Sequence, residues 1–383
     1  MKLPVYLDYN ASTPADPAVV AYMLPFFSEY FGNASSKTHK YGWIAEQAVE
    51  TAREQVASLI NAEPAEIVFT SGATEAINLA LQGVFRAYHS KGRHIIISTA
   101  EHKAVLDTCA YLEKQGAEIS LLPVDRLGKA YPEELKKLVR SDTILVAVMH
   151  GNNETGTLQH LKPLSDIAHS VKAVFMSDTT QSCGKVTVDV NEFGIDLCCV
   201  SAHKIYGPKG TGALYVRRKN PRVALSPVMF GGGHEKGLRS GTLNVAGIAG
   251  LGKAAEIAAS GLWEYGTEMS RLRTLLEQQI CDNDFCFING SVKDRLPNTT
   301  SITFPGIRAE QLIARLPDYA FSTGSACTSA SDEPSHVLLA MGLSDAEARA
   351  TIRLSLGKKN TTEEILAAAA AIRGAVSQLR SKA

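Results

Sequence analysis

The sequence has no net charge and no long apolar run. Its 39 lysine and arginine residues equal its 39 aspartate and glutamate residues in a chain of 383. Because there is no overall positive field, direct binding of nucleic acid or of an anionic membrane surface is disfavoured. No apolar stretch approaches the roughly 20 residues that a transmembrane helix needs, and no apolar segment of the signal type opens the chain. We therefore expect a cytoplasmic protein without a membrane anchor.

The seven cysteines lack the spacing of a metal site. No Cys-x-x-Cys pair occurs, so neither a zinc site nor a disulfide framework is expected. Cys198 and Cys199 are neighbours, and on a strand their side chains point to opposite faces. We expect both to fill the core, as buried free cysteines usually do. Repeats and low-complexity tracts are also missing, which leaves a globular chain of roughly two domains at about 150 residues each.

From residue 67 onward, short apolar segments alternate with helical patterns. The expected strands are 67–69, 94–97, 119–122, 144–148 and 173–176, and the expected helices are 75–88, 103–115, 132–139 and 161–169. Strands that alternate with helices of about 10 to 15 residues form parallel crossovers. We therefore predict an α/β fold with a mainly parallel sheet covered on both faces. Ligands of such sheets bind at the carboxyl ends of the strands.

The last third of the chain has a different pattern. Helical periodicity dominates residues 245–280, with a break expected near Gly261, and short strands and helices mix beyond residue 285. This pattern predicts a second, α+β unit. The predicted division is an N-terminal arm at 1–15 that joins the small-domain region, a large domain at 16–258, and a small domain at 259–383.

Polar clusters follow several of the expected strands, and the first is Ser-Gly-Ala-Thr-Glu at 71–75. It lies between a strand and a helix, so backbone N–H groups and the positive end of the helix converge on one point. That arrangement suits a phosphate group, although an N-capping serine or threonine is the commoner explanation for such a turn. No Gly-Lys-Ser/Thr follows at the required spacing, so the turn is not a P-loop.

Lys204 stands between a buried-looking strand, 196–200, and a glycine-rich turn. Burial at a strand edge would lower the pKa of its ammonium group and leave an amine that condenses with aldehydes. Asp178 closes another strand and would lie in the same crevice. Pyridoxal phosphate pairs an aspartate with a Schiff-base lysine in this way. Taken singly, Lys204 is better explained as a solvated lysine in a surface loop, and Asp178 is equally well explained as a helix cap.

His102 and Asn153 follow two further strands. The flat ring of His102 is suited to stacking on a cofactor ring, and the amide of Asn153 could donate beside that ring. The alternatives are a helix cap for His102 and a turn for Asn153. Glu154 could act as a general base, but a charged residue in a Gly-Asn turn is more often solvated or structural.

Cys327 lies in a run of small residues, 322–331. Such a loop has little to pack and moves at low cost, whereas a structural cysteine normally sits among large apolar side chains. The sequence therefore favours a nucleophilic thiol at Cys327 over a core residue. Cys183 is the rival thiol near Asp178, and its Gln-Ser-Cys-Gly context indicates a structural turn.

Together these motifs resemble the cysteine desulfurases of the iron-sulfur-cluster type, which are class-V aminotransferase-family enzymes of pyridoxal-phosphate fold type I. The matching segments are 6–14, 70–75, 101–102, 152–156, 178–181, 201–204, 231–235, 239–242 and 325–327. The resemblance runs from about residue 5 to about residue 375. It implies an aspartate-aminotransferase-like architecture, with a large α/β domain and a small α+β domain.

The resemblance also implies pyridoxal 5'-phosphate as cofactor, with Lys204, His102 and Cys327 as catalytic residues. The implied cofactor ligands are Lys204 itself, Asp178 at the pyridine nitrogen, Gln181 at the phenolic oxygen, His102 on the ring, Asn153 beside it, Ala73, Thr74, Ser201 and His203 around the phosphate, and Thr242 of the partner subunit. Arg353, with help from Asn153, would grip the substrate carboxylate, a bidentate task that suits a planar guanidinium.

The implied reaction converts L-cysteine to L-alanine. Lys204 would remove the α-proton, and the Cys327 thiolate would attack the substrate sulfur and pass it on as a persulfide. A homodimer is implied, together with an acceptor protein: a cluster scaffold, a tRNA-thiolation carrier or a component of DNA phosphorothioation. The short end at 377–383 lacks the tail by which housekeeping members engage the scaffold, so the acceptor is left open.

Three other functions compete with this one. A selenocysteine lyase would share every feature above. Another fold-type-I lyase or an aminotransferase would share Lys204 and Asp178 but would have no use for Cys327. A non-catalytic scaffold or regulator would be expected to lack the lysine or to carry a DNA-binding segment.

Overall fold

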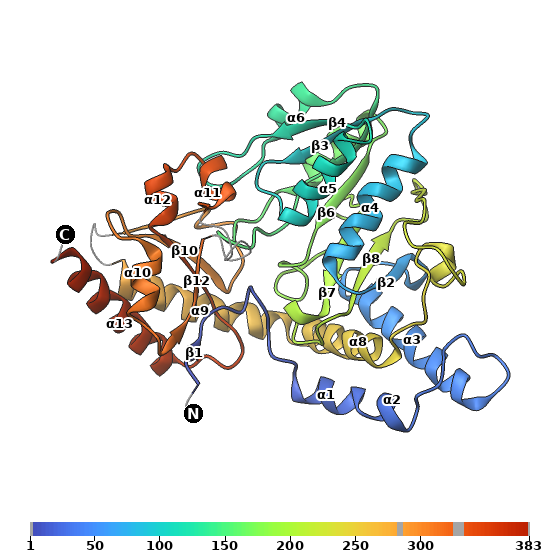
Figure 1. The fold of residues 1–383 in the computed structure, drawn as a ribbon, viewed down its shortest axis with the longest axis horizontal. Helices are drawn as coiled ribbons and strands as arrows, with labels where there is room; N and C mark the ends of the chain where they lie inside the picture. The colour runs from blue at the N-terminus through green and yellow to red at the C-terminus, as the bar shows by residue number, and fades with distance from the viewer. Residues whose placement is uncertain (1–2, 282–285, 325–332, 382–383) are drawn as a thin grey trace.

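A computed structural model describes residues 3–281, 286–324 and 333–381 (Figure 1). Its largest sheet has seven strands in the order β2-β8-β7-β6-β5-β3-β4. The strands are β2 (Ile67–Thr70), β3 (His94–Ser98), β4 (Glu118–Leu122), β5 (Thr143–Ala147), β6 (Val174–Asp178), β7 (Leu197–Ser201) and β8 (Gly212–Val216). Only β8 runs antiparallel to its neighbours in this sheet. The predicted α/β fold with a mainly parallel sheet is confirmed.

Helices cover both faces of this sheet (Figure 1). One face packs against α3 (Lys40–Leu59), α6 (Pro132–Leu138), α7 (Leu161–Ser170) and α8 (Val245–Ser260), and the other against α4 (Ala73–Ala87) and α5 (Lys103–Glu113). Neighbouring strand residues alternate between the two faces. Cys198 belongs to the first core and Cys199 to the second, and both are fully buried, as the sequence predicts.

The C-terminal part of the chain forms a second unit around a four-stranded antiparallel sheet, β12-β13-β10-β9. Its strands are β9 (Phe287–Ile288), β10 (Thr299–Thr303), β12 (Ser322–Thr323) and β13 (Thr351–Ser355), and its helices are α9 (Leu262–Ile280), α10 (Ala309–Ala314), α11 (His336–Ala340), α12 (Asp345–Arg349) and α13 (Thr362–Arg380). The predicted boundaries of the domains stay a prediction. Helix α9 runs from the large sheet into this unit (Figure 1).

Two helical segments are interrupted at identifiable residues. The predicted break near Gly261 is confirmed, because α8 ends and α9 begins around it with a bend of 72°. The helical segment after the arm is divided into α1 (Pro17–Met23) and α2 (Pro25–Ser28), because Pro25 starts a new helix. Among the described residues, no single helix passes a length and hydropathy test for crossing a membrane, although bent α8 and α9 pass it together.

The N-terminal arm connects the two units. Strand β1 (Val5–Tyr6) pairs in parallel with β11 (Tyr319–Ala320), and both termini lie at the C-terminal unit in Figure 1. The arm then crosses to the large sheet, where the N–H of Thr13 donates to the carbonyl of His203 at 2.9 Å. This crossing places the backbone at Asn10 and Ala11 against the carboxyl ends of the central strands.

Candidate active site

A cavity of about 540 Å³ lies at the carboxyl ends of the central strands. It is lined by Ala73, Thr74, His102, Asn153, Asp178, Gln181, Ser201, His203, Lys204 and Arg353, which come from five strand ends and from β13. These residues are all among those predicted. Thr242 is exposed and is not among the described residues that line the cavity, and Cys327 lies outside the described residues.

The first turn of α4 supplies the anion-binding end of the cavity. The amides of Ala73 and Thr74 have no carbonyl partner within the helix, because they belong to its first turn. Gly72 caps the helix at a φ of 155°, and a Cβ atom built there would meet no atom within 4 Å. The cradle is therefore open to a ligand and is aligned with the positive end of the helix.

Glu75 lies in the same turn, and its negative charge is compensated by an ion pair. Its carboxylate accepts from Arg239 Nε at 2.7 Å and from the N–H of Ser71 at 2.7 Å. Burial acts to raise the pKa of Glu75, but the bonds from Arg239 and Ser71 outweigh it and hold this pKa below its usual value. The ion pair with Arg239 thus neutralises the carboxylate.

Lys204 lies in the short helix that follows β7, and the N-terminal arm binds its amine. Its Nζ donates to the carbonyl oxygens of Asn10, at 2.5 Å, and Ala11, at 2.8 Å. Because the lysine lines the cavity, these contacts hold the amine at the cavity wall. A carbonyl-containing ligand would meet this nitrogen there.

Asp178 ends β6 and is held by two donors. Its Oδ1 accepts from the N–H of Thr180 at 2.9 Å and from the Cys199 thiol at 3.1 Å. Burial raises the pKa of Cys199 well above its ordinary value, so the thiol stays protonated and donates. This thiol contact was not predicted, because only the pairing of β6 with β7 brings the two side chains together.

His102 is both a helix cap and a lining residue. Its Nδ1 accepts from the N–H of Ala104 at 3.1 Å, at the start of α5. The bond places the proton of the neutral ring on Nε2 and fixes the ring at the cavity wall. His102 therefore caps the helix through Nδ1, as the alternative interpretation predicts. The capping bond does not use the face of the ring, which is still suited to stacking.

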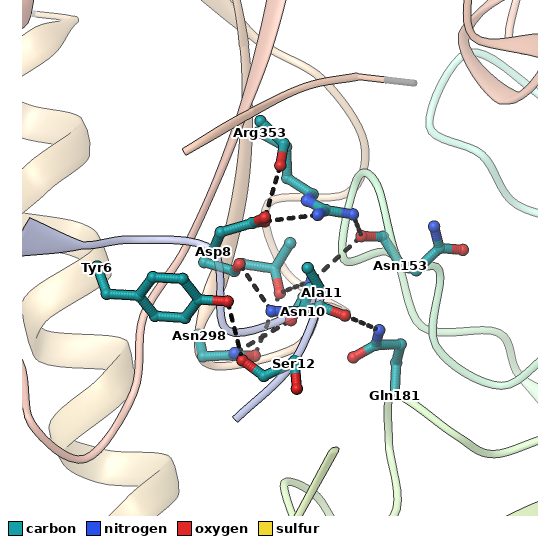
Figure 2. Close-up of polar contacts among 12 residues, drawn as sticks. Tyr6, Asp8, Asn10, Ala11, Ser12, Asn153, Gln181, Asn298 and Arg353 are labelled. Carbon is teal, nitrogen blue, oxygen red and sulfur yellow. Dashed lines mark hydrogen bonds and ion pairs between the residues drawn. The ribbon is translucent and has the colours of Figure 1, made fainter. Parts of the chain in front are cut away.

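Arg353 on β13 is buried between the arm and the large unit (Figure 2). One terminal nitrogen donates to Asp8 Oδ1 at 2.6 Å and the other to the carbonyl oxygen of Asn153 at 3.1 Å. The Nε of Arg353 is buried and has no hydrogen-bond partner among the residues that the structure describes. The guanidinium therefore keeps a donor for an incoming carboxylate, while Asp8 competes for the same cation.

The cavity carries an excess of basic side chains. Burial, together with Lys204, Lys209 and Lys185, lowers the pKa of His203 to about 4, so this imidazole is neutral at neutral pH. Ser12 contacts His203 Nδ1 through its hydroxyl at 3.3 Å. A ligand with anionic groups relieves the repulsion among these cations.

Two buried glutamates beside the cavity were not predicted to be special. Ser335 donates its hydroxyl to Glu154, which is buried, and burial raises the pKa of Glu154 to about 7. Glu154 therefore holds the start of α11 against the turn that carries Asn153, which supports the structural interpretation. Glu101 accepts from the Ser98 hydroxyl and the N–H of Met149, each at 2.7 Å, and its Oε2 is buried with no partner in the described part of the chain.

Replacing Glu101 by glutamine is expected to flatten the dependence of stability on pH. Burial raises the pKa of Glu101 to about 8 in the folded protein, against 4.5 for an ordinary glutamate. Because the pKa of Glu101 is higher in the folded state, its protonation stabilises the folded protein fully below about pH 4.5. This contribution is lost as the pH rises to about 8. Between about pH 6 and pH 8, the free energy of unfolding should fall by roughly 2 kcal/mol more in the original protein than in Glu101→Gln. Denaturant titrations at each pH measure this difference.

The matched control for that measurement is Glu113→Gln, because Glu113 is exposed on the helix that follows Glu101. Its pH curve should parallel that of the unaltered chain. If the Glu101→Gln curve also runs parallel to it, Glu101 does not hold a proton in the folded state.

A family model for class-V aminotransferases matches residues 5–367. The chain belongs to that family. A family member of Pectobacterium carotovorum subsp. carotovorum (strain PC1), named cysteine desulfurase IscS, is 50% identical over 385 residues, which cover 99% of this chain and 94% of that protein. The resemblance identified in the sequence is confirmed.

Solved structures support the same assignment. A NifS-like protein superposes with a TM-score of 0.91 at 38% identity, covering 98% of this chain and 100% of that one. A structure described as SspA in complex with cysteine superposes with a TM-score of 0.80 at 36% identity, covering 92% of this chain and 98% of that one. Both extend over the large sheet and the C-terminal unit.

The main omission of the sequence analysis is Asn10. The N-terminal arm and its motif at 6–14 were recognised in the sequence, but no role was predicted for Asn10. Asn10 is almost fully buried, and its backbone and side chain contact Lys204, Gln181, Asn153 and Lys185. Figure 2 shows the contacts with Gln181 and Asn153. A polar residue in a turn-rich opening gives no local signal of such burial, because the covering residues are far away in the sequence.

Proposed function

We infer that this chain is a pyridoxal-phosphate-dependent cysteine desulfurase, which converts L-cysteine to L-alanine and takes up the sulfur as a persulfide. The observation that carries this conclusion is 50% identity, over nearly the whole chain, to a protein named cysteine desulfurase IscS. The cavity supports it, because an amine, a carboxylate and a helix N-terminus converge there as the cofactor requires.

The described side chains fit pyridoxal phosphate. We propose that the first-turn amides of α4, at Ala73 and Thr74, hold the phosphate together with Ser201 and His203. Asp178 would hold the pyridine nitrogen, and the His102 ring would stack on the cofactor. Gln181 and Asn153 would contact its remaining polar groups, and Lys204 would bind it covalently. The unpaired first-turn amides and the open space at Gly72 support this placement.

When bound, pyridoxal phosphate supplies an electron sink for carbanion chemistry at the substrate Cα. The carboxylate of Asp178 would keep the ring nitrogen protonated. Lys204 Nζ would take the proton from Cα and hold it until it is returned. His102, with its ring proton on Nε2, would exclude water from one face of the ring and is placed to donate a proton there.

Arg353 is proposed to bind the substrate carboxylate. Its free Nε supports this role, since a carboxylate would satisfy a buried donor that has no partner among the described residues. Asn153 lies beside it, because the carbonyl of Asn153 already accepts from the guanidinium. The competing bond to Asp8 would have to lengthen as the substrate binds.

Cys327 is proposed to accept the sulfur. In the net reaction the Cβ–S bond of L-cysteine breaks and an S–S bond forms to Cys327 Sγ. Of the two thiol protons, those of Cys327 and of the substrate, one becomes the third hydrogen of the alanine methyl group and the other stays on the terminal sulfur of the persulfide. One cysteine therefore yields one alanine and one persulfide. The sulfur is oxidised by two electrons, and the carbon that becomes the methyl group of alanine is reduced by two.

We also propose a homodimer. Leu24, Phe27, Phe31 and Trp43 lie on or near α1 and α2 and at the start of α3, and each is more than half exposed. We propose that a second copy covers this surface, and that the partner's Thr242 contributes to the cavity, as the resemblance implies. Sedimentation equilibrium should give twice the mass of one chain, and the mass of a single chain would contradict the proposal.

Product analysis tests the function directly. The protein loaded with pyridoxal phosphate is incubated with L-cysteine, and alanine and sulfane sulfur are measured together. Alanine should appear in equal amount to sulfur in a single turnover, and peptide mass mapping should place the sulfur on Cys327. Production of a keto acid without sulfane sulfur would instead identify an aminotransferase. The acceptor is proposed to be a protein thiol, which the same mapping identifies after transfer.

A further inference from the structure

Lys185 is a lysine buried behind the active site. It is 3% exposed, follows the turn after β6, and makes no salt bridge in the part of the chain that the structure describes. Its Nζ donates to Gln181 Oε1 at 2.6 Å and to Asn10 Oδ1 at 3.4 Å. Burial and the nearby charges of Lys204 and Arg353 lower the pKa of Lys185 well below its ordinary value. An amine in such surroundings is costly to bury, so its presence calls for an explanation.

The other hydrogen-bond partners of Asn10 and Gln181 identify which atom of each side-chain amide faces Lys185. The Nδ2 of Asn10 donates to the carbonyl oxygen of Asn153 at 3.1 Å, and that oxygen can only accept (Figure 2). The Oδ1 of Asn10 must therefore face Lys185. In the same way, Gln181 Nε2 donates to the carbonyl oxygen of Asn10 at 2.9 Å, so its Oε1 faces Lys185. Both amide oxygens accept, and Lys185 is the donor to both.

This network determines which end of Gln181 faces the ligand. With Oε1 held by Lys185, Gln181 directs its NH2 group to the carbonyl of Asn10 and to the cavity that it lines. An amide nitrogen has two hydrogens, and the carbonyl of Asn10 uses one. The same carbonyl accepts from Lys204 Nζ, so the arm, Gln181 and Lys204 are linked through one oxygen atom.

We propose that Lys185 is a positioning residue: it holds the Gln181 amide so that an N–H donor, rather than a carbonyl oxygen, faces an acceptor atom of the bound cofactor. The proposal rests on the cofactor site proposed above. A hydrogen bond from Gln181 withdraws electron density from that acceptor. The acceptor then stabilises a neighbouring cationic nitrogen less well.

The test is the variant Lys185→Met, which keeps an unbranched side chain one atom shorter and removes the donor. The pH midpoint of the visible absorbance of bound pyridoxal phosphate should rise by roughly one unit, which corresponds to about a tenfold change in the protonation equilibrium. Gln181→Ala should raise the midpoint similarly. The double variant should match Gln181→Ala alone, because Lys185 acts through Gln181. Lys185→Arg, which retains donors, should keep the original midpoint.

The control is Lys91→Met. Lys91 likewise donates to uncharged oxygen atoms, the backbone carbonyls of Thr143, Val171 and Lys172, but it lies outside the residues that line the cavity. This variant should leave the midpoint unchanged. An unchanged midpoint in Lys185→Met, or additive shifts in the double variant, would overturn the proposal. It would also be overturned if neither Lys185 variant folds, because the lysine would then be needed for folding itself.

A measurement on ligand-free protein separates this proposal from the proposed function. With glutamine labelled by nitrogen-15, the side-chain amide of Gln181 is assigned by its loss in Gln181→Ala. Its hydrogens should exchange on the order of tenfold faster in Lys185→Met than in the original chain, because the amide is released. If the original chain gives no visible absorbance with pyridoxal phosphate but this exchange difference is seen, the cofactor assignment fails and the positioning network stands. Equal exchange rates contradict the network.

Discussion

Cys327→Ala should abolish the release of sulfur from L-cysteine while leaving the bound cofactor intact. The described residues that line the cavity are unchanged in this variant, so the visible absorbance of bound pyridoxal phosphate should be unchanged, and cysteine should still perturb it. Sulfide released by a reductant should fall by on the order of a thousandfold or more, because the thiol proposed to take the sulfur is removed. Absorbance spectra and sulfide release, measured on the same preparation, give both results.

Cys183→Ala is the matched control. Cys183 is 1% exposed, and burial raises the pKa of its thiol above the ordinary value, so it is not available as a nucleophile. This variant should release sulfide at close to the original rate. If Cys327→Ala retains sulfide release, or if Cys183→Ala loses it with the cofactor still bound, the sulfur acceptor has been assigned to the wrong cysteine.

Lys204→Ala should lose both the covalent attachment of the cofactor and the turnover of L-cysteine. The amine is the group proposed to bind the cofactor and to carry the substrate α-proton, so its removal affects two functions at once. Alanine formation should fall by on the order of 10³-fold or more. After borohydride treatment the original chain should retain pyridoxal phosphate through denaturation, and Lys204→Ala should not. Mass spectrometry of the denatured protein checks this.

A second lysine of the cavity serves as comparison for Lys204. Lys209 also lines the cavity and is exposed. Lys209→Ala should bind the cofactor more weakly, since one cation near the anion site is lost, but it should retain the borohydride-trapped adduct. If the adduct is found on Lys209, or persists in Lys204→Ala, the Schiff-base lysine is misassigned.

Much of the fold was predictable because its signals are local. The alternation of short apolar strands with helices predicts parallel crossovers, and the structure has them from β2 to β7. The antiparallel direction of β8 was not predicted, because a strand that follows a turn has no sequence signal for its direction. Helix α12 was missed as well, since its five residues are too few to show a period.

The candidate site was predicted through a general property of parallel sheets. The carboxyl ends of parallel strands meet at one edge, so the polar residues after β2, β3, β5, β6 and β7 were expected to lie together. The cavity is lined by residues after each of these strands. Arg353 came from resemblance alone, because nothing in its local sequence indicates that β13 reaches this edge.

By itself, the sequence determined the fold class, the cofactor type, the lysine and aspartate of the site and the small-residue run around Cys327. These follow from residue types and spacings within single segments. Only the tertiary structure decided that the arm at Asn10 contacts Lys204, that Asp8 pairs with Arg353, and that Lys185 holds Gln181. The physical reason is burial. The first two contacts join segments that are distant in the chain, and the third is buried by such segments. The free energy of a buried polar group depends on which neighbours exclude water from it.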